Sequence, residues 1–152
     1  MAHSPIPTWY FALTVVRREN QFVLVHERKH GQLWYLPAGR AELGEKLLDA
    51  ARRETLEEAG IRVEIDGLVR IEHTPYLDCS RVRIILTAHP LEDKPLKTQP
   101  DKHSLEARWV TLEEVKWFST RGEEVFELFE YLANGGAVYP LSLITFEGAP
   151  FV

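Results

Sequence analysis

Apolar residues along this chain follow two different spacings, and the change of spacing predicts where strands and helices form. The strand-like stretches, rich in β-branched and aromatic residues, are residues 8–16, 21–28, 62–73, 81–89 and 106–110. The polar residues 17–20 predict a hairpin turn between the first two stretches. Residues 33–37 predict a short extended segment that ends at Pro37.

The spacing becomes helical from Glu45 until Gly60, a residue suited to the left-handed position that ends a helix. At 100° per residue, the stripe that we expect to pack against the sheet consists of Leu48, Ala51, Thr55 and Ala59. Just upstream, Gly39 and Gly44 bracket a segment that we expect to be a flexible loop.

The second half of the chain ends in another helix and an apolar tail. Residues 122–133 form an amphipathic pattern, and Thr111 with Glu114 forms a capping-box pattern. Residues 90–104 contain three prolines and many charges, which predicts a loop. The tail from Gly135 could add an edge strand, cover a cleft or pack against a second subunit. Strands with helices between and after them predict an α/β fold, a mixed β-sheet covered by helices on both sides, in one domain spanning residues 1–152.

Composition and charge narrow the classes of function. Apolar residues make up 45% of the chain and charged residues 27%, which is typical of soluble globular proteins. The net charge of −5 argues against binding to DNA or RNA mainly through phosphates. The single cysteine, Cys79, excludes an intrachain disulfide and suits a reducing compartment. The N-terminus lacks a secretion-signal pattern, and no apolar stretch approaches the length of a membrane span. We therefore expect a cytoplasmic protein with neither a DNA nor a membrane partner.

Three glutamates crowd the end of the first predicted helix. Glu54, Glu57 and Glu58 lie where the helix dipole already places about half a negative charge, and like charges at this spacing repel one another. Helical geometry places them on an arc of about 100° beside the packing stripe. The nearest cation, Arg53, lies on the edge of this arc and is spaced to pair with Asp49.

Two interpretations of these glutamates are open. Exposed glutamate-rich helix faces are common, so the cluster could simply be a solvated acidic surface. Alternatively, the glycine-bracketed loop brings backbone carbonyls to the same place, and oxygen atoms alone suit a hard cation such as Mg²⁺ or Mn²⁺. The sequence contains no Cys/His cluster with zinc spacing. On this second interpretation, the glutamates are crowded together because they share a bound cation, which offsets their mutual repulsion.

The residues of this region resemble the Nudix box, G-x5-E-x7-R-E-U-x-E-E-x-G-U. The matching positions, without a gap, are Gly39, Glu45, Arg53, Glu54, Glu57, Glu58, Gly60 and Ile61. The chain departs from the common pattern at Thr55, where an aliphatic residue is usual, at Ala38 in place of glycine, and at Leu43 in place of proline. Because the Thr55 position faces the core, we expect its effect to be on packing. The resemblance extends at lower specificity to the strand order and to residues 106–110.

The resemblance implies a Nudix-type α/β/α sandwich that hydrolyses nucleoside diphosphates linked to another group with a divalent metal, usually Mg²⁺, with Mn²⁺ an alternative. The metal ligands that it implies are Glu54, Glu57, Glu58, the carbonyl of Gly39 and, from the late chain, Glu106. Arg53 would orient the glutamates, and Glu54 or Glu57 would accept the proton of the attacking water.

The resemblance also implies roles at the edges of this site. Arg28 would contact substrate phosphates, and Glu45 would steady the junction between loop and helix. Plainer interpretations stay open for three residues: Glu106 and Arg28 as exposed strand-end side chains, and Arg53 as a surface ion pair worth only tenths of a kcal/mol.

The sequence does not identify the substrate. In some Nudix subfamilies, a residue about fifteen or sixteen positions after the box glycine distinguishes the substrates. Proline there indicates ADP-ribose and tyrosine indicates dinucleoside polyphosphates, and this chain has Pro75 and Tyr76 side by side. Residues 34–45 are similar to the segment in Nudix enzymes that act on oxidised guanine nucleotides. The alternative functions are a non-catalytic nucleotide sensor, against which the intact glutamates argue, and an RNA 5′-end pyrophosphohydrolase, against which the lack of a basic cluster argues. The sequence allows a homodimer without requiring one.

Overall fold

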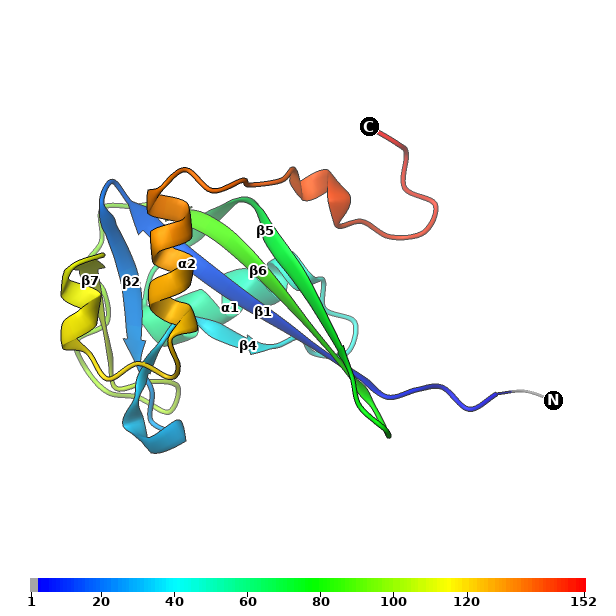
Figure 1. Ribbon diagram of the computed structural model, residues 1–152, viewed down its shortest axis with the longest axis horizontal. Helices are drawn as coiled ribbons and strands as arrows, with labels where there is room; N and C mark the ends of the chain where they lie inside the picture. The colour runs from blue at the N-terminus through cyan, green and yellow to red at the C-terminus, as the bar shows by residue number, and fades with distance from the viewer. Residues whose placement is uncertain (1–2) are drawn as a thin grey trace.

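The computed structural model describes residues 3–152, in which seven strands form one sheet and two α-helices flank it (Figure 1). The strands are β1 (Thr8–Arg18), β2 (Gln21–His26), β3 (Trp34–Tyr35), β4 (Ala38–Arg40), β5 (Val63–Pro75), β6 (Ser80–Pro90) and β7 (Glu106–Thr111). The helices are α1 (Leu47–Ala59) and α2 (Glu124–Ala133), with short 3-10 turns η1 (His30–Gln32), η2 (Glu114–Trp117) and η3 (Leu141–Leu143).

The sheet is mixed, as the sequence predicts. Its strand order is β3-β2-β1-β6-β5, and β4 pairs with β1 while β7 pairs with β2. The long central strands β1 and β6 run parallel, from Thr8 opposite Ser80 to Val16 opposite Ala88. The other pairs are antiparallel, including the predicted β1–β2 hairpin.

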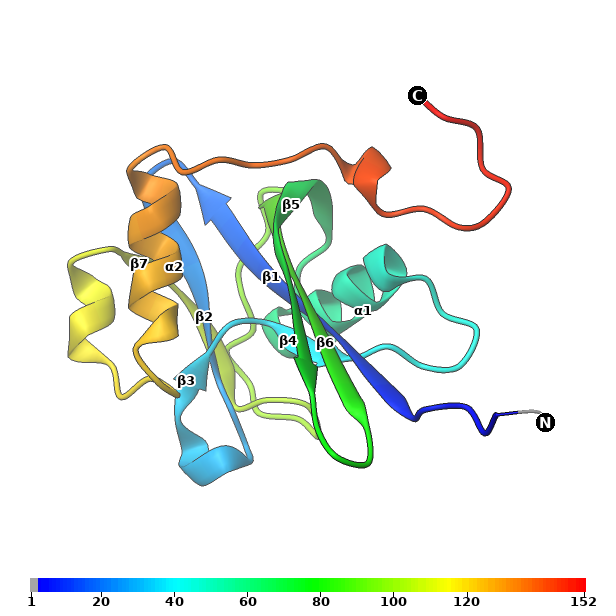
Figure 2. The same cartoon turned by 45° about the vertical axis from the view of Figure 1, so that its right-hand side comes forward.

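The two helices cover opposite faces of the sheet (Figures 1 and 2). Side chains alternate between the faces along each strand, so Ala12 of β1 packs in the α1 layer and Leu13 in the α2 layer. Helix α1 buries Ala50, Ala51 and Ala59 in its layer. Helix α2 buries Val125, Leu128, Phe129 and Leu132 in the other. The predicted α/β/α sandwich is confirmed.

Two predicted boundaries were wrong near the glycine-bracketed loop. Helix α1 begins at Leu47 and not at Glu45, because Lys46 has extended backbone angles (φ −71°, ψ 146°). The segment from Gly39 is not wholly a loop, because Gly39 lies opposite Ala12 in the β1–β4 pair. Pairing with β1 therefore fixes the position of this glycine in the sheet.

The other local predictions agree more closely. Gly60 ends α1 in the left-handed region (φ 78°). Thr111 and Glu114 form both hydrogen bonds of a capping box, at 3.0 and 3.2 Å, although the element that follows is the short turn η2. In the tail, Tyr139 exchanges two backbone hydrogen bonds with Leu68 at the edge of β5, at 2.8 and 2.7 Å. None of the helices within residues 3–152 is long and apolar enough to cross a membrane.

Candidate active site

The three glutamates of α1 do not form a solvated acidic face. Glu58 is only 8% exposed, and the side chains of Glu54 and Glu57 are 16% and 30% exposed. Beside them, the predicted packing stripe is buried at Ala51, Thr55 and Ala59. Burial of this many carboxylates is costly unless they find partners.

Glu54 and Glu58 are held against the backbone of β4. The Ala38 amide donates to Glu58 Oε1 at 3.3 Å, and the Glu54 carboxylate fills the space where Gly39 lacks a side chain. Burial, followed by the nearby charge of Glu54, raises the pKa of Glu58 well above its usual range. Burial also raises the pKa of Glu54. The repulsion predicted from the sequence is therefore concentrated in this pair.

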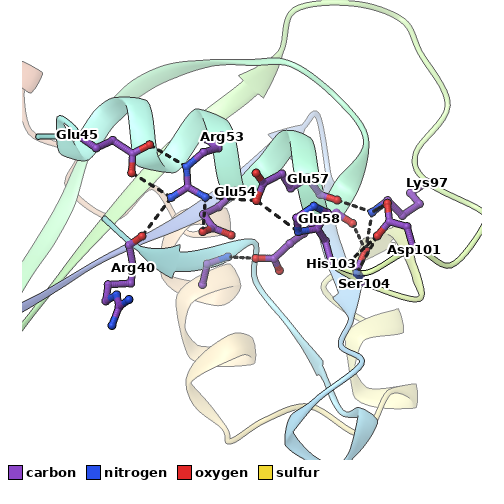
Figure 3. Close-up of polar contacts among 11 residues, drawn as sticks. Arg40, Glu45, Arg53, Glu54, Glu57, Glu58, Lys97, Asp101, His103 and Ser104 are labelled. Carbon is purple, nitrogen blue, oxygen red and sulfur yellow. Dashed lines mark hydrogen bonds and ion pairs between the residues drawn. The ribbon is translucent and has the colours of Figure 1, made fainter. Parts of the chain in front are cut away.

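Arg53 lies in the middle of the cluster and not on its edge (Figure 3). Its Nε and Nη2 donate to the two Glu45 oxygens at 2.8 and 3.0 Å, and its Nη1 donates to Glu54 at 2.8 Å and Glu57 at 3.3 Å. The predicted pair with Asp49 was wrong, because Asp49 pairs with Arg52 at 3.1 Å. As expected, Glu45 steadies the loop–helix junction: it also accepts a hydrogen bond from the Glu42 amide at 3.0 Å.

The loop before β7 provides polar partners for the C-terminal end of α1, where the helix dipole and the glutamates both place negative charge. The sequence did not identify these partners. Lys97 Nζ donates to the Glu57 carbonyl, and Ser104 Oγ donates to the Glu58 carbonyl at 2.6 Å (Figure 3). His103 Nδ1 lies 3.5 Å from Glu57 Oε2. Lys97 thus places a cation at the carbonyl end of the helix, and the same ammonium group pairs with Asp101 at 2.7 Å. The prolines of the predicted loop, the first of which ends β6, indicated only irregular backbone, and no spacing signal tied the loop to α1.

A cavity of about 540 Å³ lies along the opposite side of β4 from this cluster. Ala38, Gly39 and Arg40 of β4 contribute to its wall. The rest of its lining combines aromatic and basic side chains, which include Trp9, Phe11, Tyr35, Tyr76, His30, Arg81, Arg83 and Arg121. A concave surface of this composition suits an anionic ligand that carries a ring.

Glu27, which sequence reasoning missed, also lines this cavity. Burial raises its pKa, its Oε2 has no hydrogen-bond partner, and its Oε1 lies 3.5 Å from Arg121. An acidic residue just after a strand is usually exposed, so nothing in the sequence singled it out.

Two predicted residues have other contacts in the structure. Glu106 accepts a hydrogen bond from Arg108 at 2.5 Å. The exposed Arg28 donates to the Asp101 carbonyl at 3.0 Å. Their roles as metal ligand and phosphate contact stay predictions.

The chemistry of the cluster fits a hard divalent cation. Its donors are carboxylate oxygens beside the backbone of Gly39, and a cation between Glu54 and Glu58 would relieve their repulsion. In the described part of the chain, no three acidic, histidine or cysteine side chains already converge as a ligand set. Arg53 draws Glu54 and Glu57 to its guanidinium while Glu58 turns toward Ala38, so side-chain rotation is needed to gather the oxygens.

Comparisons with known proteins find relatives that match most of the chain. A family profile described as NUDIX domain matches residues 9–129. The chain is 34% identical over 140 residues to "Phosphatase NudJ" of Shigella boydii, covering 90% of each chain. It is 32% identical over 139 residues to "Phosphatase NudJ" of Escherichia coli K12, again covering 90% of each chain.

A solved structure of a NUDIX hydrolase from Nitrosomonas europaea superposes with a TM-score of 0.76 at 23% identity, covering 93% of this chain and 99% of that one. This likeness shows the fold. The profile match spans the strands, the glutamate helix and the loop that caps it, so the chain belongs to the Nudix family and is a Nudix hydrolase.

Proposed function

We propose that the protein hydrolyses the diphosphate linkage of a nucleoside diphosphate derivative with the help of Mg²⁺. The observation that carries this proposal is the Glu54–Glu58 pair, which lies against the backbone of Ala38 and Gly39 on β4. The other side of this strand helps to form an arginine-rich and aromatic cavity. The pair is destabilised by its own charge. A cation bound by these two carboxylates would relieve their repulsion, and a substrate phosphate could then bind to the cation.

Some residues of the site are proposed to bind the cation, and others to position these ligands. Glu54, Glu57, Glu58 and the Gly39 carbonyl would hold the cation. Glu106 is proposed as a further ligand. The bound cation supplies charge neutralisation at the phosphate oxygens and a more acidic water.

Arg53 positions Glu54 and Glu57 beside the proposed cation site, and from there their side chains would rotate to reach the cation. It bridges Glu45 to Glu54 and Glu57 through a planar fork, which a single hydrogen bond could not do. Glu54 or Glu57 accepts the proton of the attacking water. Arg28, two residues beyond the end of β2, is proposed to contact the phosphates.

The substrate is best identified by a panel assay with Mg²⁺ and with Mn²⁺. The panel contains ADP-ribose, dinucleoside polyphosphates, ordinary and 8-oxo guanine nucleotides, and triphosphate-ended RNA. We expect turnover of at least one small nucleotide and little of the RNA. If the protein binds compounds of the panel but turns over none of them, its function is that of a nucleotide sensor. If it turns over the RNA in preference to the small nucleotides, it is a 5′-end pyrophosphohydrolase.

A further inference from the structure

The wall of the cavity is built by one face of three neighbouring strands. On β1, Trp9 and Phe11 are two residues apart and therefore point to the same side. Their partners across the parallel pair are Arg81 and Arg83 of β6, and Arg40 of β4 lies opposite Phe11. All five residues line the cavity.

Arg83 is fully occupied by contacts within the protein. Its Nε donates to Glu72 at 2.6 Å and its Nη2 to Glu124 at 2.7 Å, while its Nη1 lies 3.3 Å from Tyr35 Oη. The side chain is 17% exposed. This arginine ties β6 to the start of α2 and has little capacity left for a ligand.

Arg81 and Arg40 differ from Arg83 because neither forms an ion pair with a carboxylate of the described residues. The Arg81 guanidinium lies 4.6 Å from the Phe11 ring, and the Arg40 guanidinium lies 4.8 Å from the Trp9 ring. Stacking on a ring fixes a guanidinium without neutralising it. Arg81 Nε is in addition buried without any acceptor, and a buried donor left unpaired is costly.

The two free guanidinium groups lie on the side of β4 away from the carboxylates. Figure 3 shows the Arg40 carbonyl turned toward Arg53 and the Arg40 side chain pointing away from the cluster. Under the proposed function, the cation at Glu54 and Glu58, together with Arg28, neutralises the charge on the cleaved diphosphate. The arginines are therefore surplus positive charge for any substrate whose only anion is that diphosphate.

We propose that Arg81 and Arg40, held by Phe11 and Trp9, bind a second anionic group of the substrate, separate from the linkage that is cleaved. This inference rests on the proposed function and narrows its substrate class to nucleotide derivatives with an additional phosphate or carboxylate. Planar guanidinium groups bind either group through paired hydrogen bonds. The experiment below distinguishes a phosphate from a carboxylate as the second anionic group.

Two matched substrate pairs provide the test. The first pair is a nucleoside diphosphate and the triphosphate of the same base, and the second is UDP-glucose and UDP-glucuronate, which differ by one carboxylate. For each pair, kcat and KM are measured with Mg²⁺ for wild type, Arg81→Gln, Arg40→Gln and Arg83→Gln. Quenching of Trp9 fluorescence provides an independent measure of binding, with Trp9→Phe as the reference for the other three tryptophans.

The wild type is expected to favour the more anionic member of one pair by about tenfold or more, mainly through KM. Arg81→Gln and Arg40→Gln should each remove most of that preference while the melting temperature stays near wild type. Arg83→Gln should lower the melting temperature and retain the preference. The pair that shows the effect identifies the anion as phosphate or carboxylate.

Two results would overturn the inference. Equal use of both members of each pair by the wild type would show that no second anion is recognised. An equal loss for both members in Arg81→Gln and Arg40→Gln would place these arginines on the cleaved diphosphate. Neither result would affect the proposed hydrolysis, whereas absence of both turnover and binding across the substrate panel would remove the proposed function together with the inference.

Discussion

The Glu54 carboxylate occupies the space that a side chain at Gly39 would fill. A Cβ atom built at position 39 would lie 2.6 Å from Glu54 Cγ and would overlap the carboxyl group itself. Glycine is therefore required here for the close approach of a carboxylate to a strand, and not for an unusual backbone angle. Pairing of Gly39 with Ala12 in the β1–β4 ladder fixes the backbone that the Glu54 carboxylate approaches.

Gly39→Ala should displace Glu54 and weaken metal binding by about 10- to 100-fold, the range typical when the support of a metal ligand is lost. Isothermal calorimetry with Mn²⁺ measures this loss directly. Gly44→Ala is the matched control in the adjoining loop. Its added methyl meets no neighbour, but its φ of +76° strains an alanine, so it should lower stability by about 1 kcal/mol and leave metal affinity near wild type. Equal effects of the two variants would contradict the steric explanation.

The sequence predicted the helix, its packing stripe and the sandwich well, because these depend on local periodicity. Thr55 is an example: its computed position on the stripe is buried, and its hydroxyl donates to the Ala51 carbonyl at 2.8 Å, so the departure from the Nudix pattern costs no unpaired group. The pairing of Arg53 was predicted wrongly because helical spacing considers only neighbours on the same helix. Glu45, before the helix begins, offers both carboxylate oxygens and displaces Asp49 as the partner.

The residues that the sequence missed come from segments far along the chain. Lys97 and Ser104 reach α1 only because the loop before β7 folds back over the end of the helix. Glu27 and Arg121 meet across the cavity although 94 positions separate their numbers in the sequence. Such contacts depend on strand order, which periodicity does not determine.

Arg53→Lys should reduce kcat/KM by about 10- to 100-fold although it conserves the charge. Arg53 bridges three carboxylates through a planar fork, and a lysine ammonium cannot hold all of them in place. Arg52→Lys, which alters the exposed pair with Asp49 on the same helix, should leave activity unchanged. Steady-state kinetics with the best substrate of the panel makes the comparison. Similar losses in both variants would show that Arg53 acts only through the stability of α1.

Glu57→Gln should reduce kcat by at least about 100-fold, because it removes a proposed ligand and candidate base. Its melting temperature should stay near wild type, since Glu57 is the most exposed of the three glutamates and its pair with Arg53 is long, at 3.3 Å. Differential scanning calorimetry without added metal checks this stability. An unfolded or strongly destabilised Glu57→Gln would make this glutamate structural. Glu113→Gln, at an exposed pair with Lys116, is the control for loss of an acidic charge.

Arg83→Gln should lower the free energy of unfolding by about 2 kcal/mol, between the cost of losing a surface pair and that of losing a buried one. The change leaves the partly buried Glu124 without its ion pair and leaves Glu72 with only the more exposed Arg70. Urea unfolding followed by fluorescence measures this change. Arg70→Gln removes the more exposed partner of Glu72 and should cost less than about 1 kcal/mol. If Arg83→Gln and Arg70→Gln lowered the free energy of unfolding equally, the ion pair between Arg83 and Glu124 of α2 would contribute no more than a surface pair.

Glu58 makes the stability of the protein depend on pH in a direction opposite to that of a normally paired carboxylate. Its pKa in the folded protein is raised, first by burial and then by the charge of Glu54. Above the ordinary value of 4.5, the folded state therefore retains a proton that the unfolded chain has lost. Because stability falls with pH wherever the folded state binds more protons, the free energy of unfolding should decline as pH rises from 5 through neutrality.

Glu58→Gln should flatten this decline and raise stability at pH 8 when chelator removes divalent cations, because the uncharged amide keeps the hydrogen-bonding capacity without the charge. Adding Mg²⁺ should stabilise the wild type increasingly as pH rises, since a metal binds the deprotonated carboxylate, and should stabilise Glu58→Gln far less. Thermal unfolding at pH 5, 6.5 and 8, with EDTA or Mg²⁺, tests both effects. A wild type whose stability rises with pH in EDTA would mean that Glu58 is ionised in the folded protein. In that case the strain between Glu54 and Glu58 could not be what drives metal binding.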